Sequence, residues 1–127
     1  MIRRTAFALL ALLSLMPFAT AGEIVPYDAS RFSALQAAGK PILIHVTAPW
    51  CPTCRAQHPV VSDLAAAPDN ADLVVFDIDF DSQKDVLRQF NVRQQSTLIA
   101  FHGAEERSRA VGITDPAAIA ALVATTR

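Results

Sequence analysis

The chain has 127 residues, a formal net charge of −1 and 52% hydrophobic residues. This length predicts one domain, with enough apolar side chains for a core. Its 11 basic and 12 acidic residues form no lysine- or arginine-rich cluster, which argues against nucleic acid as a partner.

The first 21 residues have the pattern of a secretory signal peptide. Two arginines precede an apolar segment at residues 6–16, Pro17 interrupts it, and an Ala-x-Ala pattern predicts cleavage after Ala21. Removal of residues 1–21 would leave residues 22–127 as one domain in the periplasm or another exported location, without stable membrane insertion. An uncleaved membrane anchor is the alternative, although a spanning helix needs about 20 apolar residues.

The first predicted elements after the leader are a strand, a helix and a second strand. Residues 23–27 are expected to form a short edge strand or an extended lead-in, because Pro26 is unsuited to the interior of a sheet. Asp28 can cap a helix at residues 29–38. The second strand covers residues 40–47, and its nearly unbroken apolar run is typical of a central strand that is covered on both faces.

A long helix follows from Pro52 to about Ala66. Pro52 suits its first turn, and Pro59 should kink it. The later elements are a strand at 73–79, a helix at 83–90 capped by Asp81 or Ser82, strands at 96–102 and 106–111 joined by a turn, and a last helix to about 125 with Asp115 as N-cap and Pro116 behind it. This order predicts a mixed sheet with helices on both faces.

The only two cysteines, Cys51 and Cys54, lie in a Trp-Cys-Pro-Thr-Cys segment at the join between the central strand and the long helix. This layout is typical of a dithiol/disulfide redox site. An exported pair tends to be oxidised, and so short a ring would stabilise the fold only modestly. The helix N-terminus favours a thiolate, so we expect Cys51, at the exposed end, to be the nucleophile and Cys54, beneath it, to resolve the mixed disulfide.

These features together resemble the thioredoxin superfamily. The resemblance rests on the order of elements, the Trp-Cys-x-x-Cys segment, Pro59 in the helix, a Val-x-x-x-x-Thr-Leu-Ile-x-Phe pattern from Val92, and Gly112 before the last helix. It covers residues 24–126 and implies an α/β thioredoxin fold with the same roles for the two cysteines. Residues 51–58 look most like exported reductants that serve cytochrome c maturation, although the longer insertion of those proteins is absent.

Three further side chains have both a functional and a structural interpretation. His45 lies where thioredoxins have a buried acid that helps to move the proton of the resolving cysteine. It could accept that proton or be a hydrogen-bonded core residue. His58 shares a helix face with Cys54 and could tune the site or lie in solvent. The resemblance implies that Trp50 lies over the site as a contact surface, and it could also serve in packing.

The superfamily has a cis-proline directly before the Thr-Leu strand, packed against the cysteines, and this chain has Ser96 there. A cis bond without proline costs about 2.5–4 kcal/mol, so we expect a trans bond after Gln95. Substrate chains of the superfamily pair with this loop, which makes Gln95, Ser96 and Thr97 candidate docking residues. Pro52 and Thr53, between the cysteines, are included as supporting residues of the predicted site.

The sequence therefore predicts an exported thiol–disulfide oxidoreductase that reduces protein disulfides and is re-reduced by a membrane thiol–electron donor. Its redox group is the Cys51–Cys54 pair, and no bound cofactor or metal is expected. A disulfide oxidase or isomerase is one alternative, since the Pro-Thr pair does not fix the potential. A copper or zinc protein is another, because two thiolates and His45 or His58 suit those ions.

Overall fold

The computed structural model describes residues 21–127. The predicted signal peptide, except Ala21, lies outside the described residues. Within them, no helix is both long enough and apolar enough to cross a membrane.

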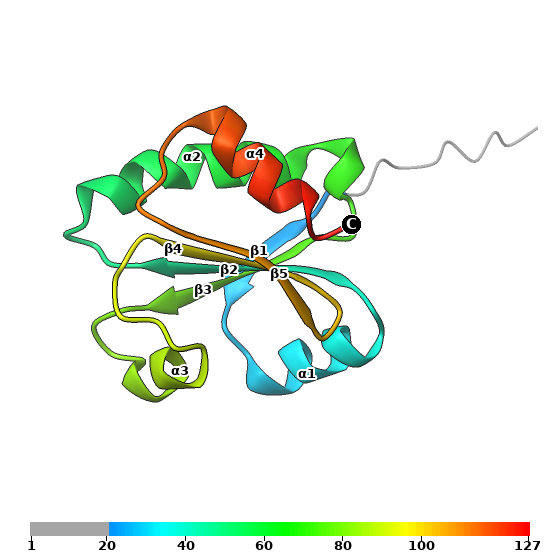
Figure 1. Ribbon diagram of the computed structural model, residues 1–127, viewed down its shortest axis with the longest axis horizontal. Coiled ribbons are helices and arrows are strands. Elements are labelled where there is room, and N and C mark those ends of the chain that lie inside the picture. Colours follow the sequence, from blue (N-terminus) through cyan, green and yellow to red (C-terminus); the bar gives the residue numbers. More distant parts are fainter. Residues whose placement is uncertain (1–20) are drawn as a thin grey trace, which may run out of the picture.

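Residues 21–127 form one five-stranded sheet and four α-helices, as Figure 1 shows. In chain order, the elements are β1 (Glu23–Pro26), α1 (Ala29–Ala37), β2 (Pro41–Thr47), α2 (Pro52–Ala66), the 3₁₀ turn η1 (Pro68–Asn70), β3 (Val74–Asp79), α3 (Lys84–Gln89), β4 (Thr97–His102), β5 (Glu105–Val111) and α4 (Pro116–Ala124). Every predicted helix and strand is present, and the ends agree to about one residue.

The sheet is mixed, with the strand order β1-β3-β2-β4-β5. Strand β3 lies parallel to both β1 and β2, whereas β4 is antiparallel to β2 and to β5. The apolar strand β2 is central, and residues 42–46 are all buried. Strand β1, which contains Pro26, lies at an edge, as a residue without a backbone N–H requires. The predicted mixed α/β architecture is confirmed.

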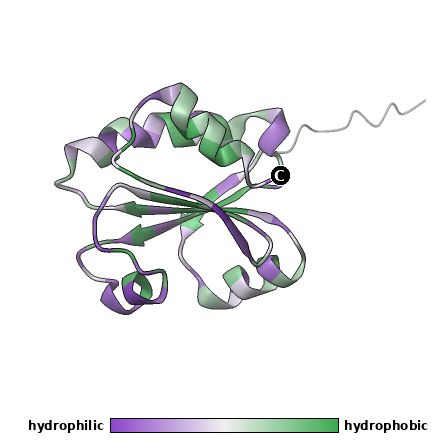
Figure 2. Ribbon diagram, viewed as in Figure 1, coloured by the Kyte–Doolittle hydropathy of each residue, from purple (hydrophilic) through white to green (hydrophobic). Residues whose placement is uncertain are grey.

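Helices cover both faces of the sheet, with α2 and α4 on one face and α1 and α3 on the other (Figure 1). Side chains alternate between the two faces along a strand. Ile42, Ile44 and Val46 join the core cluster on the α1 side, whereas Leu43 joins the cluster beneath α2 and α4. His45 has the same parity as Leu43, so its ring lies under α2. Figure 2 shows hydrophobic residues gathered on the central strands and on α4, whereas β5 is mostly hydrophilic.

The helix caps explain where α1 and α4 begin. Oδ1 of Asp28 accepts a hydrogen bond from the Arg31 N–H, and Asp115 caps α4 in the same way, as predicted. The predicted cap of α3 is wrong. Gln83 occupies the N-cap without a side-chain cap bond, because the Ser82 hydroxyl donates instead to Asp79. Helix α2 continues through Pro59 without ending there.

Candidate active site

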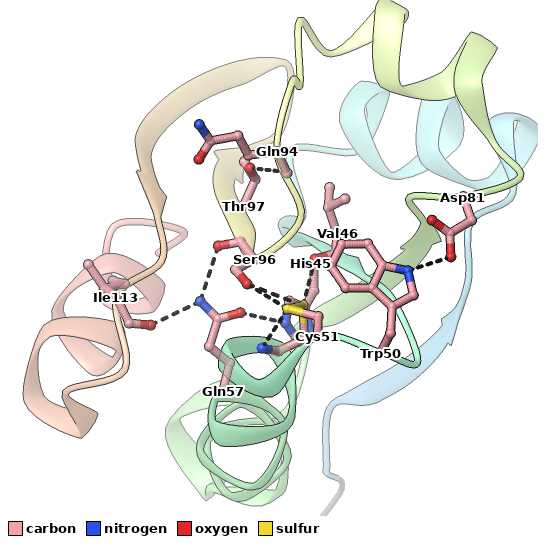
Figure 3. Close-up of a disulfide and its surroundings, with 11 residues drawn as sticks. His45, Val46, Trp50, Cys51, Gln57, Asp81, Gln94, Ser96, Thr97 and Ile113 are labelled. Carbon is pink, nitrogen blue, oxygen red and sulfur yellow. Dashed lines mark hydrogen bonds between the residues drawn. A yellow bond between two sulfur atoms is a disulfide. The ribbon is translucent and has the colours of Figure 1, made fainter.

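The two cysteines form a disulfide at the N-terminus of α2 (Figure 3). Cys51 is the N-cap residue, and its Sγ accepts a hydrogen bond of 3.1 Å from the Cys54 N–H. The Cα atoms of the pair are 5.3 Å apart. An N–H group and the positive end of a helix dipole therefore point at the sulfur of Cys51, which stabilises a thiolate there once the disulfide is reduced.

The expected difference in exposure between the cysteines is wrong for this disulfide-bonded state. Cys51 is 1% exposed and Cys54 is 4% exposed, and they form a small cluster with Ala48 and Phe80. Ala48, in the turn before α2, and Ser96, in the loop before β4, pack against both cysteines. The predicted difference between the cysteines therefore rests on their helix positions and not on exposure.

Ser96 touches both sulfurs. Its Oγ lies 3.1 Å from Sγ of Cys51 and 3.2 Å from Sγ of Cys54. Because disulfide sulfurs carry no hydrogen, the hydroxyl is the donor in these contacts. The sequence showed that Ser96 stands where the superfamily has a proline. It did not predict that the serine hydroxyl would contact both sulfurs.

The backbone of Ser96 is held on both sides. Its N–H donates to the Val46 carbonyl (2.8 Å), and its carbonyl accepts from the Gly112 N–H (3.0 Å). Its φ angle is +64°, in the left-handed region that non-glycine residues seldom occupy. The bond after Gln95 is trans, as predicted. The two hydrogen bonds to neighbouring segments compensate for the unfavourable backbone angle and keep the hydroxyl over the disulfide.

A buried glutamine on α2 connects this loop to His45. Gln57 is fully buried, and its amide nitrogen donates to the carbonyl oxygens of Ser96 (3.1 Å) and Ile113 (2.9 Å). Its amide oxygen lies 3.0 Å from Nε2 of His45. Gln57 thereby joins the loop before β4, the segment before α4 and the central strand (Figure 3).

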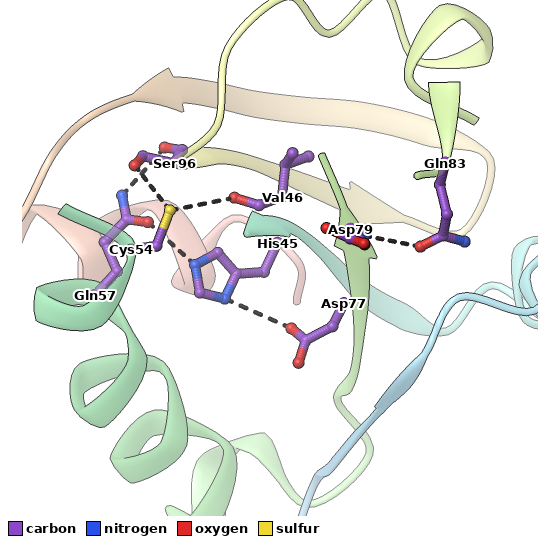
Figure 4. A network of polar contacts seen from close by, with 8 residues as sticks. All are labelled: His45, Val46, Cys54, Gln57, Asp77, Asp79, Gln83 and Ser96. Carbon is purple, nitrogen blue, oxygen red and sulfur yellow. Dashed lines mark hydrogen bonds and ion pairs between the residues drawn. The ribbon is translucent and has the colours of Figure 1, made fainter. Parts of the chain in front are cut away.

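His45 is fully buried and lies between Gln57 and Asp77, as Figure 4 shows. Its Nδ1 is 3.6 Å from Oδ1 of Asp77, the residue opposite it on β3. The His45 ring contacts Gln57, and the sulfur of Cys54 contacts Ser96. Within residues 21–127 no hydrogen bond joins the ring to either sulfur. In the fold, His45 is therefore a hydrogen-bonded core residue, as one of its two interpretations predicted.

Trp50 lies at the surface beside the disulfide. Its side chain is 53% exposed, its indole N–H donates to Oδ2 of Asp81 (2.8 Å), and its ring stacks edge-on against Phe80. One hydrogen bond and one ring contact fix its orientation while leaving a broad apolar face open to solvent. This arrangement suits the predicted contact surface.

A pocket of about 300 Å³ opens next to Cys54, with Arg55, His58 and Asp79 in its wall. Arg55 and His58 are exposed, and the His58 ring lies 6.1 Å from that of His45. The Ser82 hydroxyl, which donates to Asp79, is the main cause that lowers the pKa of that carboxyl, and a backbone N–H and Lys84 add to it. The pocket therefore brings a guanidinium, an imidazole and a carboxylate together beside the sulfur of Cys54.

The remaining predicted site residues lie around the same disulfide. Pro52 is exposed and Thr53 half-buried on the first turn of α2. Gln95 is half-buried, whereas Thr97 is buried and donates through its hydroxyl to the Gln94 carbonyl. In the part of the chain that the structure describes, no group of three or more His, Cys, Asp or Glu side chains has the geometry to hold a metal ion.

The sequence interpretation missed Gln57 and assigned no chemistry to Asp77. A signal for Gln57 was present, since the buried residues of α2 are Cys54, Gln57, Val61 and Ala65, at helical spacing. A polar residue in that stripe must find a buried partner. No local pattern could reveal Asp77, because its contact with His45 depends on the register of two parallel strands.

The sequence profile of the thioredoxin family matches residues 23–125. The chain belongs to the thioredoxin family. Its sheet order, helix arrangement and disulfide position are those of a thioredoxin fold, as the sequence predicted.

Individual thioredoxins are similar over most of the chain. The crystal structure of Trxlp from Edwardsiella tarda EIB202 is 42% identical, with a TM-score of 0.77, and the match covers 80% of this chain and 98% of that one. A thioredoxin H-type of Brassica campestris is 31% identical over 72% of this chain and 77% of its own length. A bifunctional thioredoxin reductase/thioredoxin of Mycobacterium leprae is 34% identical over 72% of this chain, which matches only 20% of that protein.

Proposed function

We propose that this protein is an exported thiol–disulfide oxidoreductase that reduces disulfides in protein substrates. The observation that carries the proposal is the Cys51–Cys54 disulfide with Cys51 at the N-cap of α2. Its membership in the thioredoxin family supports the same chemistry. The geometry provides a stabilised nucleophile and a second thiol within bonding reach of it.

The reaction requires two exchange steps. The Cys51 thiolate attacks a substrate disulfide, forms a mixed disulfide and releases one substrate thiolate, which takes a proton from water. Cys54 then gives up its proton and attacks Sγ of Cys51, which breaks the mixed disulfide and forms the intramolecular one. The second substrate sulfur leaves as a thiolate and takes up a proton, so protons balance. Two electrons pass from the dithiol to the substrate. In the reduced protein, the Val46 carbonyl, 3.9 Å from Sγ of Cys54, is an acceptor for the Cys54 thiol.

The direction of the reaction is the second part of the proposal. The family members to which the chain is similar are thioredoxins, and residues 21–127 contain no inserted helical domain of the kind found in strong oxidants of the superfamily. Both points favour a reductase that a membrane thiol–electron donor keeps reduced. A measured reduction potential near −120 mV, the value of a strong oxidant, would contradict this direction and favour an oxidase.

Export is proposed from the leader pattern of residues 1–21 and is supported by the packing of Gly22. The Gly22 N–H donates to the Ala65 carbonyl (2.7 Å). A side-chain carbon on Gly22 would lie within 2.9 Å of the carbonyl oxygens of Ala65, Asn70 and Leu73. After cleavage at this point, the new ammonium group would lie against the Ala65 carbonyl at the negative end of α2, which is a favourable position.

The decisive experiment is substrate trapping in the native compartment. A Cys54→Ala variant cannot resolve the mixed disulfide, so substrates should remain bound to Cys51 and should be released by reductant. The Cys51→Ala variant, which lacks the nucleophile, is the matched control and should trap far less. Disulfides on the cytochrome c maturation route are the first candidates, given the local resemblance of residues 51–58. Equal recovery with the two variants would contradict the proposal.

A further inference from the structure

The orientation of the Gln57 amide is fixed by its neighbours. Two carbonyl oxygens, from Ser96 and Ile113, lie 3.1 Å and 2.9 Å from one end of the amide. Carbonyl oxygens only accept hydrogen bonds, so that end must be the NH₂ group, whose two hydrogens match two acceptors. A flipped amide would place three oxygens together in the buried interior, at a substantial cost. The other end of Gln57 is therefore its oxygen.

This orientation determines the tautomer of His45. The Gln57 oxygen lies 3.0 Å from Nε2 of the buried ring. An amide oxygen can only accept, so Nε2 must carry a hydrogen and donate it. In the neutral ring, Nδ1 is then the nitrogen with a free lone pair.

Nδ1 of His45 faces the Asp77 carboxylate and not the disulfide. Nδ1 and Oδ1 of Asp77 are 3.6 Å apart, and both are buried atoms without a hydrogen-bond partner. Two facing lone pairs in a buried site are unfavourable, and one proton between them converts the contact into a charge-assisted bond. The Asp77 side chain is 32% exposed, so that proton can be exchanged with water.

We propose that Gln57 is a positioning residue that holds His45 as an Nε2–H donor, so that the ring takes up its proton at Nδ1, from water by way of Asp77. Nε2 then has no lone pair with which to receive the proton of Cys54 directly. His45 would act on the disulfide site through its charge. Gln57 and Ser96 form the chain of contacts between the ring and both sulfurs.

The charges around His45 are consistent with this coupling. Asp77 approaches it from β3 and His58 from α2, and Arg55 and Asp79 lie in the wall of the pocket beside Cys54. A Cys51 thiolate in the reduced protein would add a negative charge near the ring. This coupling, unlike the tautomer of the ring, rests on the proposed redox function: reduction of the disulfide should favour proton uptake by the His45–Asp77 pair.

The tautomer is tested by ¹⁵N NMR of the histidine-labelled mature protein in its disulfide state, across pH 5 to 8. The expected result is a neutral His45 with a protonated Nε2, followed on acidification by a change at Nδ1 together with the Asp77 carboxyl carbon. A neutral ring protonated at Nδ1, or a ring and carboxyl that show no coupled change, would overturn the inference. This result does not depend on any substrate, so it is separate from the outcome of trapping.

Two variants test the positioning role. In Gln57→Leu, Nε2 loses its acceptor, so the neutral ring should shift toward the Nδ1–H tautomer that donates to Asp77. Gln94→Leu, at an exposed glutamine, should leave the wild-type tautomer. In Asp77→Asn, the amide can donate to Nδ1, so the coupled change should disappear. An unchanged ¹⁵N pattern in folded Gln57→Leu and Asp77→Asn would contradict the role. If Gln57→Leu does not fold, the wild-type tautomer and Asp77→Asn still decide.

The coupling to the disulfide is tested by the dithiol–disulfide equilibrium as a function of pH. Each proton taken up on reduction changes the equilibrium constant tenfold per pH unit, about 30 mV for two electrons. Wild type should show a larger pH dependence than Asp77→Asn over the range in which the His45 signals move. Identical pH dependence would exclude coupling while leaving the redox activity itself intact.

Discussion

The hydroxyl oxygen of Ser96 lies 3.1 Å from Sγ of Cys51. The thioredoxin superfamily has a proline at this point of the loop, which has neither a hydroxyl nor a backbone N–H. Here the Ser96 N–H holds the loop, and the Ser96 hydroxyl offers a hydrogen to the sulfur of Cys51. Recognition and reactivity at this site should therefore differ from those of a proline-containing relative.

Ser96→Ala should make Cys51 less reactive. In the reduced protein, the hydroxyl can donate to the Cys51 thiolate, and a hydrogen bond to a charged group contributes about 1.5–3 kcal/mol. Its loss lowers the thiolate fraction at pH 7, although the remaining thiolate is more nucleophilic. We expect alkylation by iodoacetamide to slow by roughly three- to ten-fold and the reduction potential to become more negative.

The control for this prediction is Ser62→Ala, an exposed serine on the same helix as the cysteines. It should react at the wild-type rate. If Ser96→Ala also reacts at that rate while remaining folded, the hydroxyl does not stabilise the thiolate.

The sequence predicted the elements and the redox pair but not the contacts between segments. Strand β2 and helix α2 have strong local patterns, and the Cys-x-x-Cys spacing defines chemistry without reference to the rest of the fold. The Ser96 hydroxyl could not be predicted, because its position depends on a left-handed φ angle that local sequence did not indicate. The contact of His45 with Asp77 follows from strand register. Local patterns predict elements, whereas these polar contacts form only when the sheet and α2 pack together.

Trp50→Ala should weaken docking of protein substrates and leave the chemistry intact. The side chain is 53% exposed, so its removal should change the unfolding free energy by less than about 1 kcal/mol. Tryptophan is enriched among the interface residues whose truncation costs about 2 kcal/mol or more of binding free energy. We expect kcat/KM for a protein disulfide to fall by roughly ten-fold or more.

A small aromatic disulfide separates docking from reactivity in this variant. It needs little contact surface, so its reduction rate should stay within about two-fold of wild type. An equal loss for both substrates would assign Trp50 to the reactivity of Cys51.

Gly22→Ala should destabilise the mature protein. The added carbon would lie 2.7 Å from the carbonyl oxygens of Asn70 and Leu73 and 2.9 Å from that of Ala65. These are backbone atoms of α2, η1 and the segment before β3, so the chain at Gly22 must shift, at a cost of about 1–3 kcal/mol. Urea unfolding of mature wild type and variant measures this difference. An unchanged midpoint would mean that Gly22 is not held in this cradle in solution.

Asp79→Asn should reduce stability at neutral pH, and the reduction should disappear in acid. The pKa of Asp79 is lowered in the folded state by the Ser82 hydroxyl first, and by the Asp81 N–H and Lys84. A lowered carboxyl pKa stabilises the fold above the unfolded value of about 3.9. That stabilisation is lost as the pH falls through the still lower folded value. Urea unfolding at pH 7, 4 and 3 should therefore show wild type and variant converging below about pH 4.

Asp72→Asn, at another exposed aspartate, is the control for a general effect of charge. A constant difference between wild type and Asp79→Asn at all three pH values would show that the turn does not depend on the ionised carboxylate.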